Sequence, residues 1–160
     1  MKTKTYAWML DDYWTEYFDF FQTEADRKKF DQHILSYTKK QVAEHPNARF
    51  IIRISSEPEL CIAELLLELK QSNPDLRVEL LTPQEELTNT WPDAIRERYF
   101  EASYHCDSEH IVERHLTAKN VEKQYHYLLH EADEIILFTE EWGFHSHKVV
   151  FFLPPEHLLS

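Results

Sequence analysis

Three carboxylates within eight residues form the group best suited to chemistry in this sequence. Glu57, Glu59 and Glu64 follow a predicted strand, and ligand sites of α/β proteins form at the carboxyl ends of strands. Carboxylates placed there could act in general acid–base catalysis. A structural role is the alternative, because Ser56 and Glu59 have the Ser-x-x-Glu spacing of a helix capping box. We favour the structural role, since no loop that could position a substrate accompanies the acids.

Ten histidines make a metal site the second hypothesis to weigh. His126 and His130 are four residues apart and share one face of a predicted helix, but the glutamate of a His-Glu-x-x-His motif is missing. A zinc site needs three or four converging ligands. We therefore expect scattered surface histidines, no metal and no cofactor.

The two cysteines are Cys61 and Cys106, with no Cys-x-x-Cys spacing. They are expected to be free thiols in a reducing compartment rather than a disulfide or a nucleophile. Residues 1–10 lack the apolar segment of a signal peptide, and the apolar runs are far too short to span a membrane. We expect a cytoplasmic protein with no catalytic residues.

The chain contains a single glycine, Gly143, among 160 residues, where average usage of ~7% predicts about eleven. Glycine permits positive φ angles and a close approach of the backbone to a ligand. Phosphate-binding loops of the P-loop and Rossmann types depend on that property, and neither motif is present. The sequence therefore predicts no backbone-built phosphate site.

The formal net charge is −12, which repels nucleic-acid phosphates and anionic membranes. We expect neither nucleic acid nor membrane as a partner. The charge serves solubility in one interpretation and matches a basic partner protein in the other.

The elements that must position these residues alternate between strand and helix. Period-2 and helical patterns predict strands at 6–10, 49–54, 76–81, 108–113, 134–139 and 148–153, and helices at 23–45, 57–71, 91–102 and from 117. This order predicts one α/β domain, residues 1–160, with a Rossmann-like three-layer fold and a mostly parallel sheet of five or six strands. Only residues 140–147 separate the last two strands. A parallel crossover needs about a dozen or more residues, so we expect the last strand to be antiparallel.

An aromatic segment near the N-terminus is the most unusual positive feature. It either fills the ligand crevice with side chains or forms an exposed patch for a protein partner, including a second copy of the chain. The candidate patch consists of Trp8, Tyr13, Trp14, Tyr17, Phe18 and Phe21.

The order of motifs resembles the YpsA/YoqJ-type proteins of the SLOG superfamily, a Rossmann-like group that includes DprA and the LOG phosphoribohydrolases, over roughly residues 4–139. The family loop FISGMALGVDTIAAE is matched by residues 50–64, FIIRISSEPELCIAE, in which Arg53 and Glu57 replace the two glycines. Glu59 stands at the family's Asp and Glu64 at its Glu. Further matches are Trp91-Pro92, Arg98-Tyr99 and the segment around Lys123.

The resemblance implies a kept scaffold with a rewritten ligand crevice. Its candidate binding residues are Arg53, Ser55, Ser56, Glu57, Glu59, Glu64, Trp91, Arg98 and Lys123. The leading hypothesis is a non-enzymatic bacterial or phage protein that acts as a regulator or decoy by binding another protein. The alternative is a sensor of a nucleotide-derived small molecule, or a nucleoside phosphoribohydrolase-like enzyme, that uses Arg53, Arg98 and Lys123 as anion partners.

Overall fold

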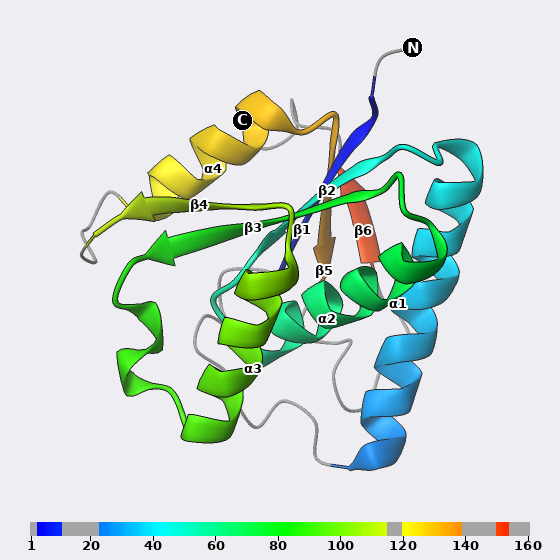
Figure 1. Cartoon of the computed structure of the whole chain (residues 1–160). Coiled ribbons are helices and arrows are strands. Elements are labelled where there is room, and N and C mark those ends of the chain that lie inside the picture. The colour runs from blue at the N-terminus through cyan, green and yellow to red at the C-terminus, as the bar shows by residue number, and fades with distance from the viewer. Residues whose placement is uncertain (1–2, 11–22, 115–119, 139–149, 154–160) are drawn as a thin grey trace.

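The computed structural model describes residues 3–10, 23–114, 120–138 and 150–153. The strands are β1 (Thr5–Leu10), β2 (Arg49–Arg53), β3 (Arg77–Gln84), β4 (Ser108–Glu113), β5 (Glu134–Phe138) and β6 (Val150–Leu153). The helices are α1 (Glu24–Glu44), α2 (Glu57–Ser72), the short 3-10 helix η2 (Leu87–Thr90), α3 (Asp93–His105) and α4 (Asn120–Glu131). Figure 1 shows the strands as one twisted sheet with helices packed against it.

The strands form one sheet in the order β4-β3-β2-β1-β5-β6. All pairs from β4 to β5 are parallel, and β6 pairs with β5 in antiparallel register, with Ile135 opposite Leu153. The expected α/β class, the mostly parallel sheet and the antiparallel last strand are confirmed. The short connection before the last strand, which has no room for a crossover, accounts for the reversal.

Helices cover both faces of the sheet, as a three-layer fold requires (Figure 1). Alternate residues of β1 point to opposite faces. Tyr6 and Trp8 join the larger core beneath α1, α2 and α3, whereas Ala7 and Met9 join a smaller core beneath α4. Burial on both faces explains why the central strands are apolar without strict alternation.

Local sequence signals predicted the ends of most helices and strands to within a few residues of those in the structure. The Thr23 hydroxyl accepts the Asp26 N–H at 3.1 Å and caps α1, as expected. The third strand was expected to end before Thr82-Pro83, which is wrong. Pairing with β4 continues to Gln84, and the Pro83 carbonyl accepts a hydrogen bond from the Asn120 amide at 2.7 Å. The expected start of the fourth helix at Thr117 lies outside the described residues.

None of the helices that the structure describes is long and apolar enough to cross a membrane.

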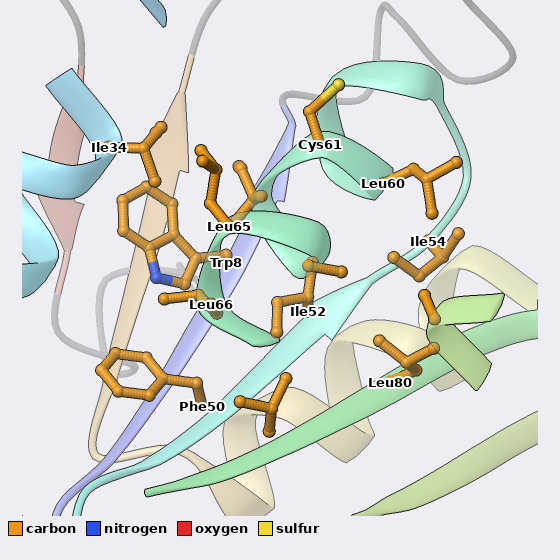
Figure 2. Close-up of a cluster of buried hydrophobic side chains, with 14 of the residues drawn as sticks. Trp8, Ile34, Phe50, Ile52, Ile54, Leu60, Cys61, Leu65, Leu66 and Leu80 are labelled. Atoms are coloured by element: carbon orange, nitrogen blue, oxygen red, sulfur yellow. The ribbon is translucent and has the colours of Figure 1, made fainter. Parts of the chain in front are cut away.

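Trp8 is fully buried, so its assignment to an exposed interaction patch is wrong. β1 is a central strand, and its face toward α1 and α2 is covered. In Figure 2 the indole lies beside Ile34, and it contacts the Tyr37 ring edge-on with centroids 5.7 Å apart. The other five residues of the candidate patch, Tyr13, Trp14, Tyr17, Phe18 and Phe21, lie outside the described residues.

Candidate functional site

The turn between β2 and α2 occupies the place where α/β proteins bind ligands. β2 ends at Arg53, and α2 begins at Glu57 with Ser56 as its N-cap. The first N–H groups of a helix lack intrahelical acceptors and attract anions. A phosphate or carboxylate is therefore the natural occupant of such a turn.

The carboxylate of Glu59 binds the donors of this turn. Its Oε1 accepts hydrogen bonds from the Ser55 N–H at 2.9 Å, the Ser55 hydroxyl at 2.7 Å and the Ser56 hydroxyl at 3.2 Å. Its Oε2 accepts from Nε of Arg53 at 2.9 Å. Backbone amide, hydroxyls and guanidinium are the groups that usually bind a phosphate. Here these groups bind the carboxylate of Glu59, a residue of α2.

Burial makes this ion pair costly to open. The side chains of Arg53 and Glu59 are 1% and 0% exposed. A charge taken out of water must be paired or hydrogen-bonded, and removing one partner leaves the other uncompensated. An anion from solution would have to displace Glu59 from its donors and leave that carboxylate without its arginine. Arg53, which the alternative hypothesis assigns to a ligand, is thus paired with a carboxylate of its own chain.

The expected capping box is wrong in its detail. Ser56 is the N-cap, but its hydroxyl makes no capping bond to the helix backbone and donates to Glu59 instead. The Glu59 carboxylate accepts the N–H of Ser55, one residue before the N-cap. The reason is Arg53, which holds the second carboxylate oxygen at the end of β2.

A second charged cluster lies between α2 and α3, around Arg98 of α3. Glu64 accepts from Nε and Nη2 of Arg98 at 3.0 and 2.6 Å, and Glu57 accepts from Nη1 at 3.1 Å. The hydrogen bonds that the guanidinium donates to Glu64 raise the pKa of Arg98, so its charge is fixed. The carboxylates of its own chain thus bind this arginine, and Arg98 and Glu64 line a groove of about 740 Å³ between α2 and α3.

Cys61 is the sulfur group of the same cluster, with Sγ 3.3 Å from Nη2 of Arg98. Burial raises the pKa of Cys61 to about 12, despite the opposing charges of Arg27 and Arg98. The group is therefore a thiol rather than a thiolate at neutral pH, and a thiol is a poor nucleophile.

The remaining candidates lie apart from the turn. Trp91 is buried and contacts the Tyr99 ring edge-on with centroids 5.7 Å apart, so it belongs to the core rather than to a ligand surface. Lys123 is on α4, the helix of the opposite face, where it pairs with Glu113 at the end of β4. The structure thus brings together two groups, Arg53–Ser55–Ser56–Glu59 and Glu57–Glu64–Arg98, and leaves Trp91 and Lys123 out of both.

Sequence reasoning missed a half-buried polar cluster between β3, α3 and β4. Glu109 accepts hydrogen bonds from Thr82, Tyr99 and the Ser103 hydroxyl, the last at 2.8 Å. Burial, followed by the hydrogen bond to Glu109, raises the pKa of Tyr99. The members come from three elements, so no local spacing indicated them. They join α3 to the sheet beside the Arg98 cluster.

The histidines of α4 contact acids of their own helix. His126 Nε2 lies 3.5 Å from Glu122, and His130 Nδ1 lies 2.9 Å from Glu131. His110 of β4 stacks on Tyr127 with centroids 4.1 Å apart. Within the described part of the chain, no three histidines, cysteines or acids gather as a metal site would require.

Comparison with known proteins places this chain in a family. The YpsA family model, described as the YspA SLOG family, matches residues 12–150. UPF0398 protein BH1768 of Halalkalibacterium halodurans is 30% identical over 124 residues, which cover 72% of this chain and 59% of that protein. The chain thus spans about three fifths of the length of this curated relative.

Proposed function

This chain belongs to the YpsA-type SLOG family, and on that premise we propose that it is a non-enzymatic member that binds another protein, as a regulator or decoy. The proposal places it in the cytoplasm of a bacterium, or of a bacterium infected by a phage that encodes it. Two free cysteines, Cys61 and Cys106, are consistent with a reducing compartment.

One observation carries the proposal: Glu59 accepts the hydrogen bonds that a ligand phosphate would need. The side chain is fully buried and bound by Ser55, Ser56 and Arg53. The acidic first turn of α2, with Glu57 and Glu59, adds further repulsion toward an anion. A family member whose anion-binding donors are occupied in this way would act through its surface, by binding another protein.

The competing hypothesis is a nucleotide-derived ligand held by side chains. It requires free cations at the crevice, and Arg53 and Arg98 are both bound to carboxylates of the chain. Lys123 lies on the helix of the opposite face and pairs with Glu113. Each cation would have to exchange an internal partner for the ligand, so the geometry favours the protein-binding hypothesis.

The surface best suited to a protein partner lies at the β4 edge of the sheet. Among the side chains that the structure describes, the exposed large apolar ones are Phe100, Tyr104 and Ile111, at 54%, 83% and 45% exposure. They belong to α3 and β4, which are consecutive elements, and β4 is an edge strand of the sheet formed by the described residues. Exposed apolar groups beside an unpaired strand edge are typical of sites that accept an extended segment of another chain.

Charge favours a basic partner segment over a second copy. The chain carries a net charge of −12, so two copies repel one another. Antiparallel pairing of two β4 strands centred on Ile111 would place Glu109 opposite Glu113, and like charges directly opposite are destabilising. The proposed occupant is therefore an extended segment that carries lysine or arginine and an apolar side chain for Ile111.

The test is direct binding of a purified partner, first identified by crosslinking from position 104, to the wild type and to a Phe100→Ser/Tyr104→Ser variant. We expect at least about a tenfold loss of affinity, since exposed aromatics are frequent hot spots. A Lys39→Ser variant on α1 is the matched control and should bind as the wild type does. Equal affinity of all three proteins would contradict the proposed surface. A dimer in light scattering would show that the partner is a second copy of the chain.

A further inference from the structure

The outer edge of β4 has a helix on each side, so a strand added there would lie beside both helices. Figure 1 shows α4 on one side of β3 and β4 and α3 on the other. Among the strands that the structure describes, β4 pairs with β3 alone. The outer edge of such a strand carries backbone N–H and C=O groups that no neighbouring strand satisfies. These groups can bind an extended chain through its backbone, and the pairing fixes which of its side chains lie on each face.

The side chains of β4 divide between the two faces of the sheet. Glu109 accepts a hydrogen bond from the Ser103 hydroxyl of α3 at 2.8 Å. His110 stacks on Tyr127 of α4, with ring centroids 4.1 Å apart. Because successive side chains of a strand point to opposite faces, Ile111 lies on the same face as Glu109, toward α3. A strand beside β4 would alternate in the same way, with one set of side chains toward α3 and the other toward α4.

The α3 side of this edge is apolar. Phe100 and Tyr104 are four residues apart on α3, so they form a row along one side of the helix. They follow directly after Tyr99 and Ser103, the residues of α3 that donate to Glu109. The opposite side of the helix faces α2 across the groove that contains Arg98. The aromatic row therefore faces the β4 edge, where an apolar side chain of an added strand can pack against it.

Glu109 gives this edge a local negative charge. The residue is half-buried, and its hydrogen bonds within the described part of the chain all come from hydroxyl groups, those of Thr82, Tyr99 and Ser103. No lysine or arginine of the described residues forms an ion pair with it. A charge in a partly buried position interacts more strongly with a nearby opposite charge than it would in water. A lysine or arginine on the α3 face of an added strand would supply that charge.

We propose that the partner segment pairs with β4 as an added strand, with an apolar side chain beside Ile111 and a lysine or arginine two residues away beside Glu109. Its backbone binds the outer N–H and C=O groups of β4, and the side chains between these two positions lie toward α4, beside His110. The inference rests on the proposed protein-binding function. It adds the mode of binding and the order of side chains that the partner must carry.

The probe is a seven-residue peptide, acetyl-Thr-Lys-Thr-Ile-Thr-Lys-Thr-amide. It carries lysine, isoleucine and lysine on one face and reads the same in both chain directions, so it fits parallel or antiparallel pairing. Titration followed by backbone amide resonances in ¹H–¹⁵N spectra should give saturable shifts for residues 108–113. A peptide with glutamate at both lysine positions should bind at least about tenfold more weakly, because like charges placed side by side are destabilising. Equal affinity of these two peptides would overturn the proposal.

N-methylation of the peptide tests whether its backbone pairs with β4. One form carries methyl groups on the nitrogens of the two inner threonines, and the other on those of the isoleucine and the second lysine. Alternate N–H groups of a strand point to the same neighbour, so one form keeps its hydrogen bonds to β4 and the other loses them. One form should bind nearly as well as the parent peptide and the other at least about tenfold more weakly. Equal affinity of the two methylated forms, or no saturable shift with the parent peptide, would overturn the proposal.

The proposed function is judged separately, with the purified partner. Loss of partner affinity in Phe100→Ser/Tyr104→Ser, combined with equal affinity of the two methylated peptides, would support the surface and reject the added strand. Unchanged partner affinity in this variant, combined with a difference between the methylated peptides, would reject the proposed function and support strand pairing at the β4 edge.

Discussion

Nε of Arg53 lies 2.9 Å from Oε2 of Glu59, and both side chains are almost completely buried at the end of β2. The pair lies at the β2–α2 turn, where the resemblance described above implies a glycine loop in the family. Arg53 lies at the end of β2 and Glu59 in the first turn of α2. Together they form an internal ion pair at the turn where an anion would otherwise bind.

Opening this pair should destabilise the fold. Glu59→Gln leaves the buried guanidinium of Arg53 without its counter-charge, and breaking a buried pair typically costs about 3–5 kcal/mol. Urea unfolding at pH 7 measures the change in the free energy of unfolding. Glu97→Gln, an exposed acid on α3, is the control and should stay within about 0.5 kcal/mol of the wild type.

The double variant Arg53→Met/Glu59→Gln separates the pair from simple loss of packing. If the ion pair matters, the double variant should be less destabilised than the two single variants summed, because neither charge is left alone. Strict additivity of the two single changes would argue against a coupled pair.

Loss of stability in acid should depend on Glu79. Burial alone would raise the pKa of this carboxyl, but hydrogen bonds from Arg49 and then Arg77 lower it overall. A pKa that is lower in the folded state contributes stability above the unfolded value, and that contribution disappears as pH falls through the folded value. The difference in unfolding free energy between the wild type and Glu79→Gln should therefore be largest near pH 6 and shrink below about pH 4.5, the ordinary pKa of glutamate. A difference that grows as the pH falls would contradict the assignment.

The two cysteines should react slowly and in a fixed order. Burial raises the pKa of Cys61 to about 12 and that of Cys106 to about 11, and Cys106 is the more exposed of the two. At pH 8 each thiolate fraction is smaller than in the unfolded chain, by roughly tenfold for each unit of pKa. Alkylation by iodoacetamide followed by peptide mass spectrometry should label Cys106 first. Labelling of Cys61 at the rate seen in urea would show that the thiol is not buried.

Truncation of Trp8 should destabilise the fold far more than truncation of Phe100. Trp8→Ala removes a fully buried indole from the core and should cost about 3–5 kcal/mol of stability. Phe100→Ala changes a ring that is 54% exposed and should cost less than about 1 kcal/mol. Thermal or urea unfolding compares the stability of the two variants. An unchanged stability of Trp8→Ala would show that the indole is exposed and not part of the core.

The fold was predictable because its signals are local. Alternating strands and helices gave the class, and the length of the segment before the last strand gave its direction. The order of the strands in the sheet has no such local signal. The sequence therefore did not show that α4, which carries Lys123, packs on the face of the sheet opposite to α1, α2 and α3. Trp8 was misplaced because its aromatic neighbours in sequence lie beyond the end of a central strand.

The site was predictable in position but not in contacts. Arg53, Ser55, Ser56 and Glu59 were expected together at the β2–α2 turn, which is where they lie. Their capping-box spacing predicted bonds to the helix backbone, whereas the arginine two residues before Ser55 redirected the carboxylate. The partners of Glu109 come from β3, α3 and β4, and such long-range clusters need the folded chain to be seen.

Isothermal titration with AMP and with ADP-ribose tests most directly whether Glu59 closes the ligand turn. The account predicts no saturable heat for the wild type, because the donors of Ser55, Ser56 and Arg53 are already bound. Saturable binding of either nucleotide to the wild type, lost in Ser55→Ala, would contradict it and favour the sensor hypothesis.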